Sequence, residues 1–401
     1  MKIIYHHRTQ ADDAQGVHIY EMVKAFRDLE HVVEIVALVK RDSENEQKTQ
    51  GSSWEWITKR TPARVYELMA LSYNVLGYVR LAKKIRQFGP DLLYERYSLN
   101  TFCGIWASRA FGIPLILEVN APLAYEQNKL GKLAFKRLAR FSERWICSHS
   151  TVTLVVSQVM KTMLTSSGVP AAKMNVMPNG INPKIFHPQV SGGDIRQRHG
   201  LKDNLVVGFV GWFRQWHGLE MLLEIMHEAR LAEKNVRLLL VGDGPALPHL
   251  QKYVEEHRLQ SAVTMTGPVA RGEIPQYIAA MDIAVQPAAT EYACPMKIPE
   301  YMAMAKCIIA PDQPNIREIL EHGVTAALFS PNDKNALRAT LLQLIDNATI
   351  RKRLGCAAYQ CLFERGMLWQ YNAARAVHLV HKTTRSQASS PIVAYLKSST
   401  A

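Results

Sequence analysis

The segment LVVGFVGWFRQWHGLE (residues 205–220) begins with an apolar run, passes through a short polar loop and ends in a helical pattern that starts near Gly218. An apolar run of this length, bounded by glycine, predicts a strand that is buried on both faces of a parallel sheet. A strand, a loop and a helix in this order form the repeating unit of a doubly wound α/β domain. In such domains ligands bind beyond the carboxyl ends of the strands, so the loop of this segment is a candidate site.

The same unit recurs along the chain. Before the segment, strands are expected at 2–5, 34–39, 92–94, 115–119 and 152–156, and helices at 16–29, 62–88, 100–111 and 128–149. After it, further strands are expected at 236–242, 262–265, 282–287, 307–310 and 326–329. We therefore predict two Rossmann-like, doubly wound domains that face each other across a cleft.

The domain boundaries are predicted from breaks in this periodicity. Pro, Gly and polar residues replace the pattern over 183–203, which places the linker at 186–203. The N-terminal domain then spans 1–185 and the C-terminal domain 204–365. A further helix is expected at 366–382, and the Ser- and Thr-rich residues 383–401 are expected to form a flexible tail.

Composition limits the class of protein. The chain has 401 residues, of which 48% are hydrophobic and 21% charged, and this excludes a disordered or fibrous chain. No apolar run approaches the roughly 20 residues that a membrane span needs, and the N-terminus has too short an apolar patch for a signal peptide, so a cytoplasmic location is expected. The 6 cysteines include no C-x-x-C pair, so neither a metal site nor a disulfide framework is predicted.

Charge is distributed unevenly along the chain. Residues 51–190 contain 18 Lys and Arg against 7 Asp and Glu, whereas residues 201–350 contain 13 against 17. The basic first half suggests a face that meets an anionic surface or substrate. The acidic balance of the second half, and the lack of any recognition motif, argue against nucleic-acid binding.

Several strand-end loops contain groups that suit a diphosphate. Gly16 opens a helix after the first strand, where backbone N–H groups can approach a phosphate. Arg214 and His217 lie in the loop of the 205–220 segment, and Lys297 precedes Glu300 at the start of another helix. A plain helix start, a surface arginine and a capping histidine remain open as alternative interpretations. There is no G-x-G-x-x-G fingerprint for a dinucleotide.

The combination of motifs resembles a known family, the retaining GT-B glycosyltransferases of family 4. It rests on QGVHIYEMVKAF (15–26), VMPNGIN (176–182), FVGWFRQWHGLE (209–220), LLVGDGP (239–245), PMKIPEYMAMAKCIIA (295–310) and a late helix with Trp369. The resemblance implies an α/β, GT-B fold, with the 366–382 helix crossing back to the N-terminal domain. It also implies transfer of a sugar from a nucleotide diphosphate to an acceptor hydroxyl, with retention, no metal and no cofactor. The absence of a D-x-D sequence agrees with metal-free chemistry.

The resemblance assigns roles to individual residues. Arg214, His217, Lys297 and Glu300 would be catalytic, with the first two at the leaving phosphates and Glu300 at the ribose. The donor would also be bordered by Gly16, Val269, Pro295 and Met296, with Val269 meeting the nucleobase through its backbone. His18 and Asn120 would lie on the acceptor side.

The sequence departs from the family pattern at several of these positions. Trp212 stands where the family often has Arg, His217 where it has Lys, Tyr292 where it has an acid, and Asn120 where it has His. Two interpretations follow: a variant active site, or a non-catalytic protein that binds nucleotide-sugars. A GT-B sugar-nucleotide epimerase is a further alternative.

The acceptor side gives fewer signals. Residues 128–145, NKLGKLAFKRLARFSERW, are expected to form one helix with many basic side chains among apolar ones. Such a helix could lie on an anionic bilayer, which would place the enzyme peripherally at the inner face of a membrane. It could equally be a core-packed helix with a solvated basic face. A glycan or lipid-linked acceptor, in cell-surface polysaccharide or glycolipid synthesis, is the corresponding expectation.

Overall fold

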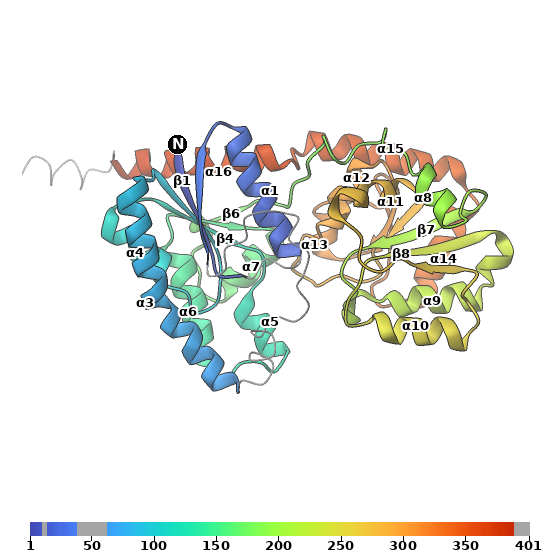
Figure 1. The fold of residues 1–401 in the computed structure, drawn as a ribbon, viewed down its shortest axis with the longest axis horizontal. Coiled ribbons are helices and arrows are strands. Elements are labelled where there is room, and N and C mark those ends of the chain that lie inside the picture. The colour runs from blue at the N-terminus through green and yellow to red at the C-terminus, as the bar shows by residue number, and fades with distance from the viewer. Residues whose placement is uncertain (10–13, 38–61, 389–401) are drawn as a thin grey trace, which may run out of the picture. The chain divides into compact units, whose positions relative to one another are not determined.

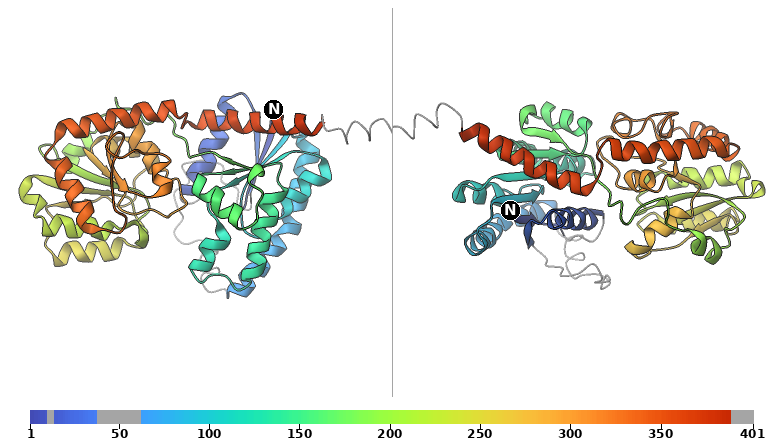
Figure 2. Two further views of the ribbon diagram at one scale, coloured as in Figure 1. Left: turned by 180° about the vertical axis from the view of Figure 1, so that it is seen from behind. Right: turned by 90° about the horizontal axis from the view of Figure 1, so that it is seen from above.

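The computed structural model describes residues 1–9, 14–37 and 62–388, and the chain folds into two compact units (Figures 1 and 2). Unit 1 comprises Met1–Pro178 together with Trp369–Ala401, and unit 2 comprises Asn179–Leu368. Residues 38–39 of the expected second strand, and residues 389–401 of the expected tail, lie outside the described ranges.

Unit 1 is built on a parallel sheet with the strand order β2-β1-β3-β4-β5-β6. Its strands are β1 (Lys2–His7), β2 (Val32–Ala37), β3 (Leu92–Arg96), β4 (Leu115–Val119), β5 (Val152–Val155) and β6 (Met174–Val176). β3 and β4 are buried along their whole length, as expected for short apolar strands covered by helices on both faces. Five strands were predicted from sequence, whereas β6 was not, because Asn175 at the centre of its Met-Asn-Val sequence interrupts any apolar run.

The helices of unit 1 alternate with these strands. They are α1 (Ala14–Asp28), α3 (Ala63–Phe88), α4 (Cys103–Phe111), α5 (Leu123–Lys129), α6 (Lys136–His149), α7 (Gln158–Ser166) and α16 (Trp369–Ala388). The prediction of one helix over 128–149 is wrong. The chain turns after α5 because Gly131 adopts a φ of +67° and the Lys132 N–H donates to the Gln127 carbonyl at 2.9 Å. α6 begins only at Lys136.

The last helix packs in unit 1, as the resemblance implied. α16 lies against α1, where the rings of His18 and Trp369 meet edge to face at 4.7 Å. The Asn372 side chain donates to the Pro178 carbonyl at 2.8 Å. α16 continues to Ala388, so residues 383–388 are helical and not part of a tail.

Unit 2 repeats the architecture with a second parallel sheet, in the order β12-β11-β10-β7-β8-β9. Its strands are β7 (Leu205–Val210), β8 (Val236–Val241), β9 (Val263–Met265), β10 (Ile283–Val285), β11 (Cys307–Pro311) and β12 (Ala327–Phe329). Its helices are α8 (Gly193–Arg198), α9 (Leu219–Glu228), α10 (Leu247–Glu256), α11 (Ile274–Ala279), α12 (Lys297–Ala303), α13 (Pro314–Arg317), α14 (Lys334–Ile345) and α15 (Ala348–Glu364). The predicted α/β fold of two Rossmann-like domains is confirmed.

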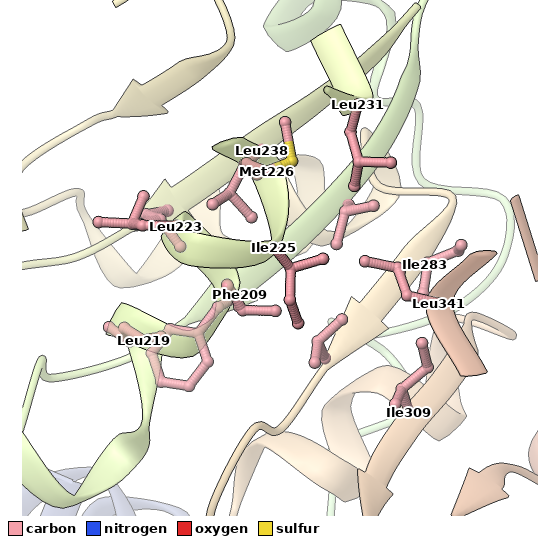
Figure 3. Close-up of a cluster of buried hydrophobic side chains, with 14 of the residues drawn as sticks. Phe209, Leu219, Leu223, Ile225, Met226, Leu231, Leu238, Ile283, Ile309 and Leu341 are labelled. Atoms are coloured by element: carbon pink, nitrogen blue, oxygen red, sulfur yellow. The ribbon is translucent and has the colours of Figure 1, made fainter. Parts of the chain in front are cut away.

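One apolar cluster holds the sheet of unit 2 to the helices on one face (Figure 3). Phe209, Leu238, Ile283 and Ile309 come from four neighbouring strands, and Leu223 comes from α9. Complete burial of each such side chain contributes about 1.5–3 kcal/mol. The strand ends that carry the candidate site are therefore fixed by a dense core.

The predicted linker at 186–203 is part of unit 2, which is a correction to the domain boundaries. Ile195 in α8 and Leu201 after it are buried, and Arg196 forms an ion pair with Asp282 at 2.7 Å. These contacts attach the segment to the start of β10. They could not be predicted from the periodicity of the sequence. Unit 2 already begins at Asn179, within the VMPNGIN motif.

Candidate functional site

The loop between β7 and α9 is braced by the loop after β8. The Phe213 N–H donates to the Asp243 carbonyl at 2.7 Å, and the Phe213 carbonyl accepts from the Ala246 N–H at 3.0 Å. Gly242 has a φ of +128°, and a Cβ at this position would lie 2.1 Å from the Gly211 carbonyl oxygen. Only glycine permits this close approach, so LLVGDGP and FVGWFRQWHGLE form one backbone unit.

His217 is a neutral, buried side chain of this loop. Its Nδ1 accepts a hydrogen bond from the Arg214 backbone N–H at 3.2 Å. Burial, followed by the nearby charges of Lys297 and Arg214, lowers the pKa of His217 to about 2. Because Nδ1 is an acceptor and the ring is neutral, the proton lies on Nε2. His217 can therefore donate one hydrogen bond, for which the Trp212 backbone already lies within reach, but it does not carry a charge at neutral pH.

Lys297, the first residue of α12, lies against the same loop. Its Nζ is 3.9 Å from the centre of the Phe209 ring, which is a cation–π contact. A Cβ on Gly211 would lie 3.2 Å from this Nζ. Burial lowers the pKa of Lys297 to about 7, and the Glu300 carboxylate acts in the opposite direction. The ammonium group thus sits where a bound anion would favour its charged form.

Glu300 is buried one turn further along α12 and lies near a residue that the sequence analysis missed. The Arg271 Nη1 is 3.8 Å from the Glu300 Oε1. Arg271 belongs to the 3₁₀ turn Arg271–Glu273, two residues after Val269. A single arginine in a polar loop forms no sequence pattern that would mark it as functional. The available signal was that Arg271 lies in the same GPVARGE loop as Val269. The Tyr301 hydroxyl, which accepts from the Val210 N–H at 3.0 Å, ties α12 to the end of β7.

Two further residues missed in the sequence analysis hold the loop that precedes α12. The Asn315 side chain donates to the carbonyls of Thr290 and Ala293 at 2.9 and 2.7 Å. The Asn179 side chain donates to the Cys294 carbonyl at 2.7 Å, and its position in VMPNGIN was the available signal. Pro295 and Met296 follow this loop and lead directly into α12.

Tyr292 lies in the same loop. Its side chain is 6% exposed, whereas the neighbouring Glu291 is exposed. A buried aromatic side chain therefore occupies the position where the family pattern has an acid.

A second group of polar side chains lies in unit 1, around Glu118 near the carboxyl end of β4. The Glu118 Oε1 is 3.1 Å from the His18 Nε2 and 3.3 Å from the Arg96 Nη1, and it also accepts a hydrogen bond from Asn120. The Tyr5 hydroxyl donates to Oε2 at 3.3 Å. Burial by itself would raise the pKa of Glu118, but His18, Arg96 and Asn120 outweigh it and lower the pKa.

The two predicted acceptor-side residues, His18 and Asn120, are thus joined through a carboxylate that sequence analysis overlooked. An acid inside the apolar run LILEV (115–119) was the signal that could have identified Glu118. Gly16 lies in the first turn of α1, two residues before His18.

The predicted residues therefore fall into two groups. Unit 2 brings together Arg214, His217, Lys297 and Glu300, with Val269 on the neighbouring loop and Pro295 and Met296 before α12. Unit 1 contains Gly16, His18 and Asn120. Within the described ranges, no cluster of three or more His, Cys, Asp or Glu side chains could hold a metal ion.

Sequence models of two glycosyltransferase groups match the chain. The model described as "Glycosyltransferase Family 4" covers residues 15–185, and the model described as "Glycosyl transferases group 1" covers residues 204–347. The chain belongs to glycosyltransferase family 4.

Relatives and solved structures agree with this membership. The glycosyltransferase is 24% identical to the alpha-D-kanosaminyltransferase of Streptomyces kanamyceticus over 62% of its own length and 65% of the relative's. It is also 24% identical to the UDP-Gal:alpha-D-GlcNAc-diphosphoundecaprenol alpha-1,3-galactosyltransferase of Escherichia coli, over 70% and 73% of the two chains. The Anabaena HepE structure in complex with UDP and glucose shares the GT-B fold, with a TM-score of 0.70 and 18% identity over 97% and 100% of the chains.

In the part of the glycosyltransferase that the structure describes, no helix is long and apolar enough to cross a bilayer.

Proposed function

We propose that this glycosyltransferase moves a sugar from a nucleotide diphosphate to a hydroxyl of a glycan or lipid-linked acceptor, with retention of the anomeric configuration. Two relatives support the substrate classes. The name of the Escherichia coli relative gives UDP-Gal as donor and a diphosphoundecaprenol-linked sugar as acceptor, and HepE binds UDP and glucose. The proposed role is in cell-surface polysaccharide or glycolipid synthesis, peripherally at the inner face of a membrane.

The observation that carries the proposal is the half-buried Lys297, whose Nζ lies against the Phe209 ring. A lysine whose pKa is lowered to about 7 is only partly charged, and a nearby anion would restore its charge. Arg214 and Lys297 both bring positive charge toward His217. A diphosphate bound among Arg214, His217 and Lys297 would receive two cations and one neutral N–H donor.

The remaining contacts suit a nucleoside. The Glu300 carboxylate has the acceptor oxygens that a ribose diol needs, and Arg271 beside it would orient the carboxylate. The backbone at Val269 would meet the nucleobase, and Pro295 and Met296 would border the phosphates and the sugar.

The proposed reaction needs no metal and no cofactor. The bond between the anomeric carbon and the phosphate oxygen breaks, and the acceptor hydroxyl attacks the same face and gives its proton to the departing diphosphate. The Lys297 and Arg214 cations and the His217 Nε2–H would stabilise the charge that develops on that diphosphate. Positioning can supply about 7–11 kcal/mol, and each well-placed donor about 3–4 kcal/mol. His18 and Asn120 would position the acceptor.

A donor panel tests the proposal. The thermal shift of the full chain is measured with UDP, GDP, ADP and their sugar conjugates, and Glu300→Ala serves as the site variant. Stabilisation by one nucleotide series that is lost in Glu300→Ala is expected, because the ribose contact is removed. Equal stabilisation of wild type and variant would remove Glu300 from the site, and no stabilisation by any donor would contradict the proposal.

A second candidate function is donor binding without transfer. The observation that favours it is Tyr292, a buried aromatic residue in place of the family's acid. The two candidates differ in turnover. Only the transferase is expected to release nucleoside diphosphate from the bound sugar-nucleotide. Its product should show a retained anomeric configuration by NMR. A GT-B epimerase would instead change the donor sugar without any acceptor.

A further inference from the structure

Helix α3 presents an apolar stripe to solvent on the side opposite to its packed face. The stripe consists of side chains that are between 38% and 70% exposed: Val65, Leu68, Met69, Val75, Leu76 and Val79. The spacing of these residues places them on one side of the helix, whereas Ala70, Asn74 and Gly77 on the other side are buried. The sequence pattern alone did not single out this stripe, because a helix with apolar residues on both sides has a weak amphipathic signal.

The stripe contains no charged residue between its ends. From 65 to 79 the only charged residue of α3 is Glu67, and its side chain is buried. Exposed apolar surface of this extent on a helix is costly in water and marks a surface that is covered when the protein functions.

A second exposed surface, the basic segment, lies at the N-terminal end of α3 and meets that helix through Glu67, on the packed side. The Glu67 carboxylate accepts hydrogen bonds from the backbone N–H groups of Ala134 at 2.6 Å and Phe135 at 3.3 Å. This joins the N-terminal end of α3 to the turn between α5 and α6, and Figure 1 shows these elements gathered at one end of unit 1. The basic segment has five exposed cations: Lys129, Lys132, Lys136, Arg137 and Arg140.

The basic segment also exposes apolar side chains and lacks acids. Residues 128–141 contain no Asp or Glu. Leu130, Phe135 and Phe141 are 58%, 37% and 51% exposed, whereas Leu133 is buried. Apolar side chains that stand among cations, without acids between them, match a lipid bilayer with anionic headgroups: the cations attract the surface and the apolar groups enter it.

We propose that the apolar stripe of α3 and the basic segment together form a docking surface for an anionic lipid bilayer. The proposal differs from the expectation of one basic helix over 128–145. Much of α6 packs into unit 1, and the lipid-facing groups come from the α5–α6 turn, the exposed side of α6 and α3. The surface does not depend on the proposed chemistry, because vesicle binding needs no donor and no acceptor.

Vesicle co-sedimentation of the full chain tests the surface. The probes are vesicles of phosphatidylcholine alone and vesicles that also contain phosphatidylglycerol. The wild type is expected to bind only the anionic vesicles and to dissociate at about 1 M salt, where charges are screened beyond about 3 Å. Equal binding to both vesicle types, or no binding to either, would overturn the proposal.

Two variants separate the charged and the apolar parts. Lys132→Glu, Lys136→Glu and Arg140→Glu together are expected to weaken partitioning by at least about a hundredfold, since each cation near an anionic surface contributes about a fivefold factor. Leu68→Gln, Val75→Gln and Val79→Gln together are expected to weaken it by about tenfold or more. All six side chains are exposed, so thermal unfolding is expected to stay unchanged.

A matched control and a second readout complete the design. Lys202→Glu, Lys234→Glu and Lys352→Glu apply the same charge change to exposed lysines of unit 2, and vesicle binding is expected to persist. Loss of binding in this control would show a general charge effect and overturn the assigned surface. Sedimentation velocity gives the oligomeric state, and a wild-type dimer that the α3 variant dissociates, without vesicle binding, would make the stripe a self-interface instead. Nucleotide thermal shifts, measured in parallel, report separately on the donor site.

Discussion

The Lys297 ammonium lies 3.9 Å from the centre of the Phe209 ring, beside the carboxyl end of β7. The ring face offers partial negative charge but cannot accept a full hydrogen bond, so the ammonium remains poorly compensated in a half-buried position. This explains the lowered pKa of Lys297 and identifies the place in unit 2 where an added anion would be most stabilised.

Replacing Lys297 should weaken donor binding without lowering the stability of the fold. Lys297→Met keeps most of the packing and removes the cation, so we expect the donor Kd to rise by roughly 10- to 100-fold, the equivalent of about 1.5–3 kcal/mol for a charged hydrogen bond. The free energy of unfolding should not fall, because a partly desolvated charge is removed. Titration calorimetry and thermal unfolding measure the two effects.

Lys306 provides the matched control for this variant. It is also a half-buried lysine of unit 2, and desolvation lowers its pKa to about 8. Its Nζ donates to the carbonyls of Ala279 and Met281 at 2.7 and 2.8 Å. Lys306→Met should therefore lower stability and leave the donor Kd unchanged. A donor Kd that changes equally in both variants would contradict a specific role for Lys297.

The affinity for the donor should depend on pH through Lys297. A bound diphosphate favours the charged ammonium and so raises the pKa above its value of about 7 in the free protein. Below pH 7 the lysine is protonated before and after binding, and affinity is at its maximum. Above pH 7 binding must first take up a proton, so the affinity for a sugar-nucleotide should fall by up to tenfold per pH unit. Calorimetry from pH 6 to 9 checks this, and the slope should disappear in Lys297→Met.

His217 should not titrate anywhere in the working range of the enzyme. Its pKa, lowered to about 2 by burial and by two neighbouring cations, leaves the ring neutral with its proton on Nε2. The imidazole ¹⁵N shifts of His217 should stay constant from pH 5 to 9. A titration of His217 near its ordinary pKa would mean that the ring is charged and that its contribution is that of a cation.

Sequence patterns predicted structural elements correctly where functional residue types and an apolar periodicity occur in the same short segment. Residues 205–220 predicted β7, its loop and α9 because an apolar run, glycines and a helical pattern follow one another without interruption. The position of α12 after a Pro-containing loop located Lys297 and Glu300 in the same way. These features are local, so a linear pattern can reveal them.

The residues that sequence analysis missed can be recognised only from contacts between segments that are distant in the sequence. Arg271 is identified only by its contact with Glu300. Asn179 is identified only by its hydrogen bond to the carbonyl of Cys294, 115 residues away. The break at Gly131 was overlooked because the apolar and basic pattern continues across it, although the backbone reverses. The 186–203 segment resembled a linker because its buried side chains, Ile195 and Leu201, are too few to show a period.

The Glu118 carboxylate should stabilise unit 1 in a manner that depends on pH. Glu118→Ala leaves the Arg96 guanidinium buried without its main anionic partner, which should cost about 3–5 kcal/mol in the free energy of unfolding. Because the pKa of Glu118 is lowered in the folded protein, its stabilisation is present above about pH 4.5 and is lost as the pH falls below that value. Urea unfolding at pH 7 and pH 4 measures both. A wild-type stability that is unchanged between these two pH values would contradict this account.

The close approach of Gly242 to Gly211 gives the sharpest test of the site's backbone. In Gly242→Ala the new Cβ meets the Gly211 carbonyl oxygen at 2.1 Å, and the residue must also keep a φ of +128°. One of the two loops must move, and since Phe213 ties them together, the Arg214–His217 turn should move with them. Both stability and donor affinity should fall.

Gly267→Ala is the control, because Gly267 has a φ of +69° but open space around its Cβ position, so only the left-handed backbone cost of about 1–2 kcal/mol applies. Calorimetry with the donor should show a large rise in Kd for Gly242→Ala alone. An unchanged Kd would mean that the two loops do not depend on each other for their geometry.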